Sequence, residues 1–190
     1  MTPYLCTTFC QGANSSALTG MNFAGVEYAK ECFCDFNIQG TAKKVNETLC
    51  NSPCSGDPSY ICGGAGYVSI YQDKGHDGVL PTNRNKIGNW TFDGCFKDNT
   101  SVNKTVKRTL SERAEISTGV TIEKCTAQCA TKGFHISGLE FGQECWCGSS
   151  FLVANTTALL GDCSQACKAN HTELCGAANR LSVYTSPIFA

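Results

Sequence analysis

Cysteine is the residue type in this sequence with the clearest capacity for chemistry. The 190 residues include 15 cysteines, close to the density that is typical of disulfide-rich extracellular chains. Their Cys-x3-Cys and Cys-x-Cys spacings would suit zinc in a reducing compartment and disulfides in an oxidising one. Seven Asn-x-Ser/Thr sequons favour the oxidising compartment, and they begin at Asn14, Asn46, Asn89, Asn99, Asn103, Asn155 and Asn170. We therefore expect a secreted, N-glycosylated chain whose cysteines form disulfides and which holds no metal or other cofactor.

The cysteines also divide the sequence into two copies of one pattern. The first copy contains Cys6, Cys10, Cys32, Cys34, Cys50, Cys54 and Cys62, and the second contains Cys95, Cys125, Cys129, Cys145, Cys147, Cys163, Cys167 and Cys175. From the Cys-x-Cys pair onward the spacings are identical, at a constant offset of 113 residues, as from Cys32 to Cys145. We assign residues 1–72 to the first domain, 73–91 to a turn-rich linker, 92–185 to the second domain and 186–190 to a tail.

The first copy has no counterpart of Cys95, which would lie about 24 residues before Met1 if both copies had the same length. We therefore expect the chain to begin inside the first domain, Met1 not to be the native start, and a signal peptide to have been removed upstream. One cysteine of this copy should then lack its partner. The alternative is an odd thiol that pairs between chains, and the spacing alone leaves the pairing of all the cysteines open.

Short helices and strands must position these cysteines. Thr2 as N-cap, Pro3 in the first helical position and Gly12 as a stop predict a first helix, and Thr121 to Gly133 repeats it. The i, i+4 cysteines then lie on one helical face. Strands are predicted at Met21–Tyr28, Glu31–Cys34 and Tyr67–Tyr71, and again at Phe134–Phe141, Glu144–Cys147 and Arg180–Tyr184. A second short helical turn is predicted to carry Cys163 and Cys167. The expected fold is α+β, disulfide-rich, with two modules, each a short antiparallel sheet crossed by one or two short helices.

Charge and patterning exclude several classes of function. The formal net charge is −1 and the sequence has no lysine or arginine cluster, which argues against nucleic-acid and membrane-surface partners. No apolar run approaches the length of a membrane span. The three histidines have no counterparts between the copies, and no nucleophile with a base stands out. We therefore expect no enzymatic activity and a neutral partner.

Three stretches of the second copy, with its eight-cysteine spacing, resemble the WSC domain. They are Gly138–Gly148, Cys175–Tyr184 and Asn89–Asp98, and Arg108–Leu110 is similar to the first internal motif of the family. The resemblance implies a PAN/apple-like fold and a role in binding fungal cell-wall carbohydrate, chiefly β-1,3-glucan. The first copy departs from the pattern by its missing first segment, by six extra residues between Cys10 and Cys32, and by Tyr67 in the place of Arg180.

Alternation along the strand places a candidate sugar site on the face opposite the cysteines. If Cys145 and Cys147 point inward, Trp146 points outward, with Glu144 and Glu140 beside it. Glu31 and Glu27 join Phe33 in the first copy. A ring can stack on the C–H face of a sugar while carboxylates accept hydrogen bonds from its hydroxyls. The alternative is that Trp146 simply covers its own sheet.

Other residues near these strands complete the candidate set. Phe141 and Tyr28 have the opposite parity and are expected in the core, with contact to a glycan as the alternative. Asn179 and Arg180 could donate to sugar hydroxyls, although we favour an ion pair of Arg180 with Glu140 or Glu144. The candidate residues for carbohydrate binding are Glu27, Tyr28, Glu31, Phe33, Tyr67, Glu140, Phe141, Glu144, Trp146, Asn179 and Arg180.

The predicted function is thus a non-catalytic, lectin-like tandem that binds cell-wall polysaccharide outside the cell, as an appendage of a larger secreted protein. One alternative is a structural or adhesive extracellular protein whose modules self-associate. Another is the ectodomain of a cell-wall stress sensor.

Overall fold

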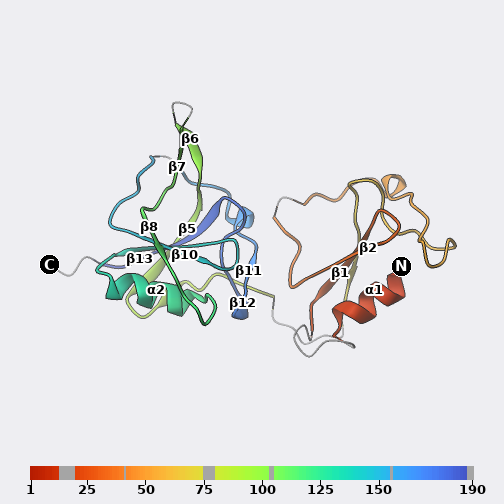
Figure 1. Ribbon diagram of the computed structural model, residues 1–190, viewed down its shortest axis with the longest axis horizontal. Helices are drawn as coiled ribbons and strands as arrows, with labels where there is room; N and C mark the ends of the chain where they lie inside the picture. Colours follow the sequence, from red (N-terminus) through yellow and green to blue (C-terminus); the bar gives the residue numbers. More distant parts are fainter. Residues whose placement is uncertain (13–19, 41, 75–79, 103–104, 155, 188–190) are drawn as a thin grey trace. The chain divides into compact units, whose positions relative to one another are not determined.

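The computed structural model describes residues 1–12, 20–40, 42–74, 80–102, 105–154 and 156–187 (Figure 1). The chain divides into two compact units. The first comprises Met1–Ile38 and Ala42–Leu80, and the second comprises Gln39–Thr41 and Pro81–Ala190. We call them module 1 and module 2. Both are small α+β units held by disulfides, which confirms the predicted fold class.

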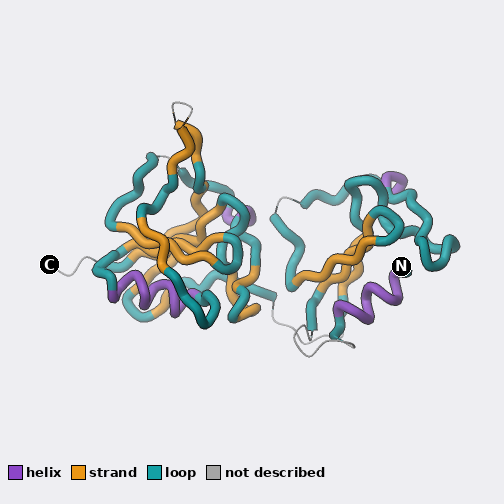
Figure 2. The backbone as a smooth tube through the Cα atoms, viewed as in Figure 1, coloured by secondary structure: helices purple, strands orange, loops and turns teal. Residues whose placement is uncertain are grey.

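Module 2 is built on an antiparallel sheet with the strand order β4-β5-β13-β9-β10-β8. These strands are β4 (Lys86–Ile87), β5 (Trp90–Lys97), β8 (Glu112–Ala114), β9 (Ile136–Glu140), β10 (Glu144–Gly148) and β13 (Arg180–Thr185). Two smaller ladders pair β6 (Thr100–Val102) with β7 (Thr105–Lys107) and β11 (Ala166–Cys167) with β12 (Asn170–Leu174). Helix α2 (Ile122–Thr131) packs against one face of the large sheet (Figure 2).

Disulfides attach helix α2 to the sheet. They join two helix cysteines spaced i, i+4 to two strand cysteines spaced i, i+2. The hydroxyl of Thr121 caps the helix by accepting a hydrogen bond from the backbone N–H of Lys124. One turn further along, two disulfides join the helix to β10, and they are Cys125–Cys145 and Cys129–Cys147. Because all four sulfurs lie between helix and sheet, they form the centre of the larger hydrophobic core of module 2.

The opposite face of the same sheet carries a second core. Phe96, Leu110, Ile136, Leu181 and Val183 form it, with Trp146 packed at its edge. Gly138 is required here, because a Cβ at this position would lie 2.7 Å from Cδ1 of Leu110. The sheet of module 2 is therefore covered on both faces.

Module 1 repeats only the central part of this arrangement. Its sheet has the order β2-β1-β3, formed by β1 (Phe23–Glu27), β2 (Glu31–Asp35) and β3 (Ser69–Gln72), and it is crossed by α1 (Pro3–Cys10). The disulfides are Cys6–Cys32, Cys10–Cys34 and Cys54–Cys62. Sulfur supplies much of its core, since the buried apolar cluster consists of Cys6, Cys10, Ala24, Val26, Cys54 and Cys62.

The described residues include every cysteine of the chain, and among them Cys50 alone has no disulfide. Its counterpart Cys163 bonds to Cys95. The predicted unpaired cysteine of the first copy is therefore confirmed, and it is the one whose partner would occupy the position of Cys95.

The second helical turn is the element that the sequence predicts wrongly. Cys163 follows a single 3-10 turn, η2 (Leu160–Asp162), and Cys167 lies in β11. The equivalent turn in module 1 is η1 (Glu47–Leu49). The disulfide between Cys167 and Cys175 closes a short loop in which β11 pairs with β12, so an extended backbone replaces the expected helix.

Candidate functional site

Trp146 lies on the face of β10 that points away from α2. Its neighbours Cys145 and Cys147 are buried beneath the helix, whereas Trp146 itself is half-buried. The indole Nε1 donates a hydrogen bond of 3.1 Å to the carboxylate of Glu144. Glu140 sits opposite Glu144 on β9. Alternation along the strands thus brings together the three residues that the sequence places at the centre of the candidate site.

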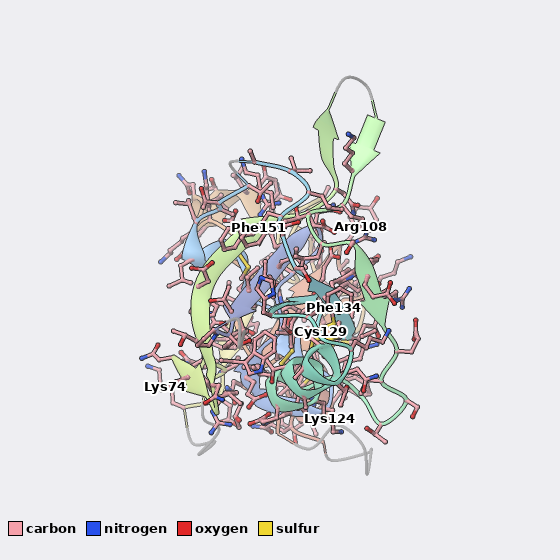
Figure 3. The ribbon with its side chains drawn as sticks, turned by 90° about the vertical axis from the view of Figure 1, so that its left-hand side faces the viewer. Lys74, Arg108, Lys124, Cys129, Phe134 and Phe151 are labelled. Atoms are coloured by element: carbon pink, nitrogen blue, oxygen red, sulfur yellow. A yellow bond between two sulfur atoms is a disulfide. The ribbon has the colours of Figure 1, made fainter. Side chains whose placement is uncertain are left out.

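Arg108 covers this cluster from the segment that follows β7. Its guanidinium lies 4.0 Å from the centre of the Trp146 ring. It donates to Oε2 of Glu140 at 2.6 Å and also to the carboxylate of Asp98. Figure 3 shows Arg108 below the β6–β7 hairpin, away from the helix that carries Cys129. The aromatic face of Trp146 is therefore stacked on a cation.

Arg108 and Asp98 are functional candidates that the sequence analysis missed. Asp98 is buried at the end of β5, and its other oxygen accepts a hydrogen bond of 2.6 Å from the backbone N–H of Thr109. Both residues belong to segments that resemble the family, so a signal for them was present. The alternation of side chains along a strand could not predict them, because Asp98 and Arg108 lie just outside the strands of the large sheet.

Glu140 has the most perturbed acidity in the cluster. Its residue surface is only 4% exposed. Burial, reinforced by the charge of Asp98, raises the pKa of Glu140 to about 7 against the opposing attraction of Arg108. Glu140 therefore helps Asp98 to hold the Arg108 guanidinium in place, and it lies beneath the surface that a ligand would touch.

Phe141 and Tyr28 are exposed, which overturns their expected place in the core. Phe141 is 45% exposed and Tyr28 is 55% exposed. Each follows the last residue of its strand and has a positive φ, 55° for Phe141 and 48° for Tyr28. Strand alternation stops at such a hairpin turn, so parity does not predict where these rings point. Both turns present an aromatic ring to solvent.

Arg180 pairs with Asp162 and does not pair with Glu140 or Glu144. Its Nε lies 3.0 Å from Oδ2 of Asp162. The register explains this correction, because Leu181 is the residue of β13 opposite Glu140, and Arg180 therefore lies beyond the end of β9.

Asn179 is exposed and lies near the Arg108 cluster. Its Oδ1 accepts a hydrogen bond of 2.7 Å from Nδ2 of Asn99, and its carbonyl accepts one of 3.0 Å from the backbone N–H of Asp98. Among the candidate residues of module 2, the structure thus gathers Glu140, Phe141, Glu144, Trp146 and Asn179 near one end of the sheet.

Module 1 presents a more open version of the same hairpin. Phe33 is 51% exposed and Glu31 is exposed as well. Glu27 is half-buried and lies opposite Glu31 in the β1–β2 ladder. Tyr67 is half-buried and pairs with Gly64 in an isolated bridge. Across the described residues of module 1, no arginine covers Phe33, because residues 1–80 contain none.

Four sequon asparagines lie within the described residues. Asn46 and Asn89 are exposed, and Asn99 and Asn170 are partly exposed. In two of the sequons the asparagine Oδ1 accepts from the hydroxyl two residues later, at 3.0 Å between Asn46 and Thr48 and at 2.8 Å between Asn170 and Thr172. Asn14, Asn103 and Asn155 lie outside the described residues.

Within the described ranges, two groups of cysteine sulfur atoms have the proximity that a metal site needs, and they are Cys6–Cys10–Cys32 and Cys125–Cys129–Cys145. In the structure all six sulfurs belong to disulfides. In the part of the chain that the structure describes, neither helix combines the length and apolarity that crossing a bilayer demands.

Comparison with known proteins gives one family. The model of the WSC domain matches residues 1–64 and 92–177. Two proteins named "WSC domain-containing protein" from Arthroderma benhamiae are 30% and 34% identical over 93% and 91% of this chain. This chain spans only 21% and 23% of the length of those two relatives. A protein named "Putative fungistatic metabolite" from Chaetomium globosum is 31% identical over 87% of this chain and 75% of its own length.

Proposed function

The chain belongs to the WSC domain family of extracellular carbohydrate-binding modules, and from this membership we propose that it is a secreted glycoprotein segment that binds β-1,3-glucan of the fungal cell wall. The seven disulfides suit an extracellular module. The relatives from Arthroderma benhamiae are several times longer than this chain, which is compatible with a role as an appendage of a larger protein.

The observation that carries the proposal is that the same hairpin of both modules carries an exposed aromatic ring and acidic residues. In module 2 the β9–β10 hairpin has the exposed Phe141 at its turn, and Glu144 on β10 accepts a hydrogen bond from Trp146. In module 1 the β1–β2 hairpin presents Tyr28 and Phe33 with Glu31. These are the groups that a neutral hexose needs: a flat apolar surface for its C–H face and acceptors for its hydroxyls.

Arg108 contributes by fixing the site. It holds the Trp146 ring by a cation–π contact and ties Glu140 to Asp98 across two strands. The Arg108 side chain is 36% exposed, and a guanidinium has five N–H donors, so we propose that it also donates to a sugar oxygen. In this role Arg108 is a positioning residue as well as a contact.

Each site alone should bind weakly. A stacked ring contributes about 0.5–1.5 kcal/mol beyond its buried area, and a charge-assisted hydrogen bond contributes about 1.5–3 kcal/mol. Two modules on one chain compensate, because the first contact raises the effective concentration of the second along a repetitive polymer.

We assign no hydrolytic role to the acidic residues. A glycosidase places two carboxyl groups on either side of the scissile bond. Asp98 and Glu140 are instead buried and bind the same guanidinium, so their arrangement fits a structural ion-pair network.

Retention on insoluble polysaccharides tests the proposal. The full chain is incubated with β-1,3-glucan, chitin and cellulose, and the bound fraction is measured against polymer concentration. We expect selective retention on β-1,3-glucan, and we expect Phe141→Ala combined with Phe33→Ala to weaken it by about tenfold, the equivalent of ~1.4 kcal/mol.

Matched controls come from exposed apolar residues outside the hairpins. Tyr60 is 55% exposed and Leu159 is 78% exposed, so Tyr60→Ala with Leu159→Ala should leave retention unchanged. Circular dichroism confirms that all variants fold. Absence of retention on every polymer, together with self-association in solution, would overturn the proposal in favour of an adhesive protein.

A further inference from the structure

The sequon that begins at Asn99 lies beside the candidate sugar site of module 2. Asn99 directly follows Asp98, the buried carboxylate that binds Arg108. It is partly exposed and lies between β5 and β6, with a φ of 51°. Figure 3 shows Arg108 at the base of the β6–β7 hairpin, which begins immediately after Asn99. A glycan on Asn99 would therefore start next to the guanidinium that covers Trp146.

The side-chain amide of Asn99 is held at this surface by a hydrogen bond. Its Nδ2 donates to Oδ1 of the exposed Asn179 over 2.7 Å. An amide nitrogen of asparagine carries two N–H bonds, so one can donate to Asn179 while the other is replaced by the bond to a glycan. The contact with Asn179 thus leaves Asn99 open to modification and restricts the direction in which the glycan begins.

The turn that carries Asn179 also contacts the tip of the β9–β10 hairpin. Ala177 and Arg180 close this turn by two backbone hydrogen bonds, of 3.0 and 3.1 Å. The carbonyl of Ala177 accepts a further one, of 3.3 Å, from the backbone N–H of Phe141. The Phe141 ring is exposed at this tip. A single turn of backbone therefore separates the partner of Asn99 from the exposed ring.

Module 1 shows that this turn does not require an asparagine. At the offset of 113 residues the counterpart of Asn179 is Gly66, and both have a positive φ, 57° and 76° respectively. Glycine adopts such a backbone without strain, and asparagine is one of the few other residues that adopt it readily. Gly66 has no side chain that could contact a glycan. The amide of Asn179 is therefore what distinguishes the turn of module 2.

The groups around Asn99 suit the sugar with which an N-glycan begins. This sugar is N-acetylglucosamine, a neutral pyranose with apolar C–H faces and oxygen acceptors. Its C–H face can stack on the Phe141 ring. Its oxygens can accept hydrogen bonds from Arg108, whose side chain is partly exposed. These are the contacts that the proposed function assigns to a cell-wall polysaccharide.

We propose that an N-glycan on Asn99 folds back onto the surface between Phe141 and Arg108 and occupies the sugar site of module 2. The inference rests on the proposed function, because it takes this surface to be one that binds sugar. A tethered sugar has a high effective concentration at the surface, so weak contacts are sufficient to hold it there. The glycan thus competes with polysaccharide for module 2, and its removal opens the site.

The covalent step is transfer of an oligosaccharide from a polyprenol diphosphate donor in the secretory pathway. A bond forms between Nδ2 of Asn99 and C1 of the first N-acetylglucosamine, while the bond between C1 and the diphosphate oxygen breaks. Nδ2 loses one proton, and polyprenol diphosphate is the leaving group. The N–H that remains on Nδ2 can still donate to Asn179.

Loss of the sequon tests the proposal. Ser101→Ala removes the hydroxyl that the sequon requires and keeps Asn99 itself. The full chain and this variant are secreted from a eukaryotic host. Glycopeptide mapping should find Asn99 modified in the parent chain and unmodified in the variant.

Hydroxyl-radical footprinting measures the coverage of Phe141 without any polysaccharide. If the glycan occupies the surface about two-thirds of the time, Ser101→Ala should raise the oxidation of Phe141 about 3-fold. Tyr28 is the internal reference, because it is exposed at the equivalent hairpin position of module 1. Its oxidation should not change.

Retention on β-1,3-glucan measures the competition. Both forms carry Phe33→Ala, so that binding depends on module 2. At the same occupancy, loss of the glycan should tighten retention about 3-fold, because the apparent affinity scales with the fraction of sites that are free.

Two further variants show whether the effect is specific to this glycan. Thr172→Ala removes the sequon of Asn170 on β12, which Figure 1 places at the opposite end of module 2 from the β6–β7 hairpin. It should change neither the oxidation of Phe141 nor retention. Asn179→Gly introduces the residue of module 1 and should raise the oxidation of Phe141 in the glycosylated chain but not in Ser101→Ala.

Three results would overturn the proposal. They are an unmodified Asn99 in the parent chain, equal oxidation of Phe141 with and without the glycan, and equal, measurable retention of the two Phe33→Ala forms. Failure of every form to bind any polymer would count against the proposed function alone, because footprinting still reports whether the glycan covers Phe141. The inference and the proposed function therefore fail separately.

Discussion

Module 1 and module 2 share three central strands, one crossing helix and three equivalent disulfides, yet the same strand positions lie in different surroundings. Leu181 and Tyr184 are fully buried in module 2, whereas Val68 and Tyr71 at the equivalent positions of module 1 are 39% exposed. The difference arises from segments without a counterpart in the described part of module 1: Phe96 and Leu110 pack with Leu181 on one face of the module 2 sheet, and Trp90 and Phe92 pack with Tyr184 on the other. Burial of a residue in this fold is therefore decided by distant segments more than by its own strand.

The two modules also differ in how much of their core consists of large apolar side chains and how much consists of disulfides. Among the described residues, module 2 has two apolar clusters that contain large side chains, and module 1 has one small cluster composed mostly of cysteine. A thin core of this kind needs covalent support to remain folded. The two modules should therefore respond very differently to loss of the same bond.

Removing the equivalent helix–sheet disulfide from each module should give the largest contrast. Loss of a native disulfide costs about 2–5 kcal/mol. We expect Cys10→Ala with Cys34→Ala to unfold module 1 at room temperature, and Cys129→Ala with Cys147→Ala to lower the thermal midpoint of module 2 while leaving it folded. Amide hydrogen exchange followed by mass spectrometry reports each module separately. Equal losses of protection in both modules would contradict the idea that sulfur replaces apolar packing in module 1.

Truncation of one apolar residue at equivalent positions of the two modules should give the next largest contrast. Leu181→Ala removes a fully buried side chain and should cost about 2–5 kcal/mol. Val68→Ala changes the equivalent exposed position and should cost about 0.5 kcal/mol. Chemical denaturation with residue-level exchange measures both. A cost at Val68 close to that at Leu181 would show that the face of module 1 is covered in solution.

The pH dependence of module 2 should give the smallest effect. The pKa of Glu140 is raised to about 7 from an ordinary value of 4.5. The folded module therefore holds a proton that the unfolded chain has lost between these two values, so stability is fully present below pH 4.5, falls as the pH rises towards 7 and then levels off. The slope should not exceed about 1.4 kcal/mol per pH unit, the limit for a single proton.

Tryptophan fluorescence makes this measurement specific, because both tryptophans of the chain, Trp90 and Trp146, belong to module 2. Urea unfolding is followed between pH 4 and 8, values chosen to bracket the window that Glu140 defines. Glu140→Gln should flatten the profile. A slope that persists in Glu140→Gln would assign the titration to another group.

Much of the fold follows from the sequence because sulfur chemistry and backbone periodicity are both local. The Cys-x3-Cys and Cys-x-Cys spacings match one helical turn and one strand repeat, so they predict the helix that crosses each sheet and the side on which Trp146 lies. The internal repeat also predicts one cysteine without a partner in the first copy, and the structure shows that it is Cys50.

The remaining parts depend on interactions that periodicity does not encode. Arg108 reaches Trp146 from a segment outside the ladder, and the pairing of Arg180 with Asp162 depends on the register between β13 and β9. Phe141 and Tyr28 occupy turn positions, where the direction of a side chain is set by a positive φ. Residues at strand ends and between strands are thus placed by tertiary contacts, which the local sequence pattern does not encode.

Gly138 lies in the interior of module 2, but a side chain at this position would affect residues near the surface. A methyl group there would lie 2.7 Å from Cδ1 of Leu110, whose surroundings are fully packed, so the leucine would have to move outward. Leu110 is two residues along the chain from Arg108. A substitution at Gly138 that displaces Leu110 should therefore also shift Arg108 and weaken its contact with Trp146, although it changes no residue at the surface.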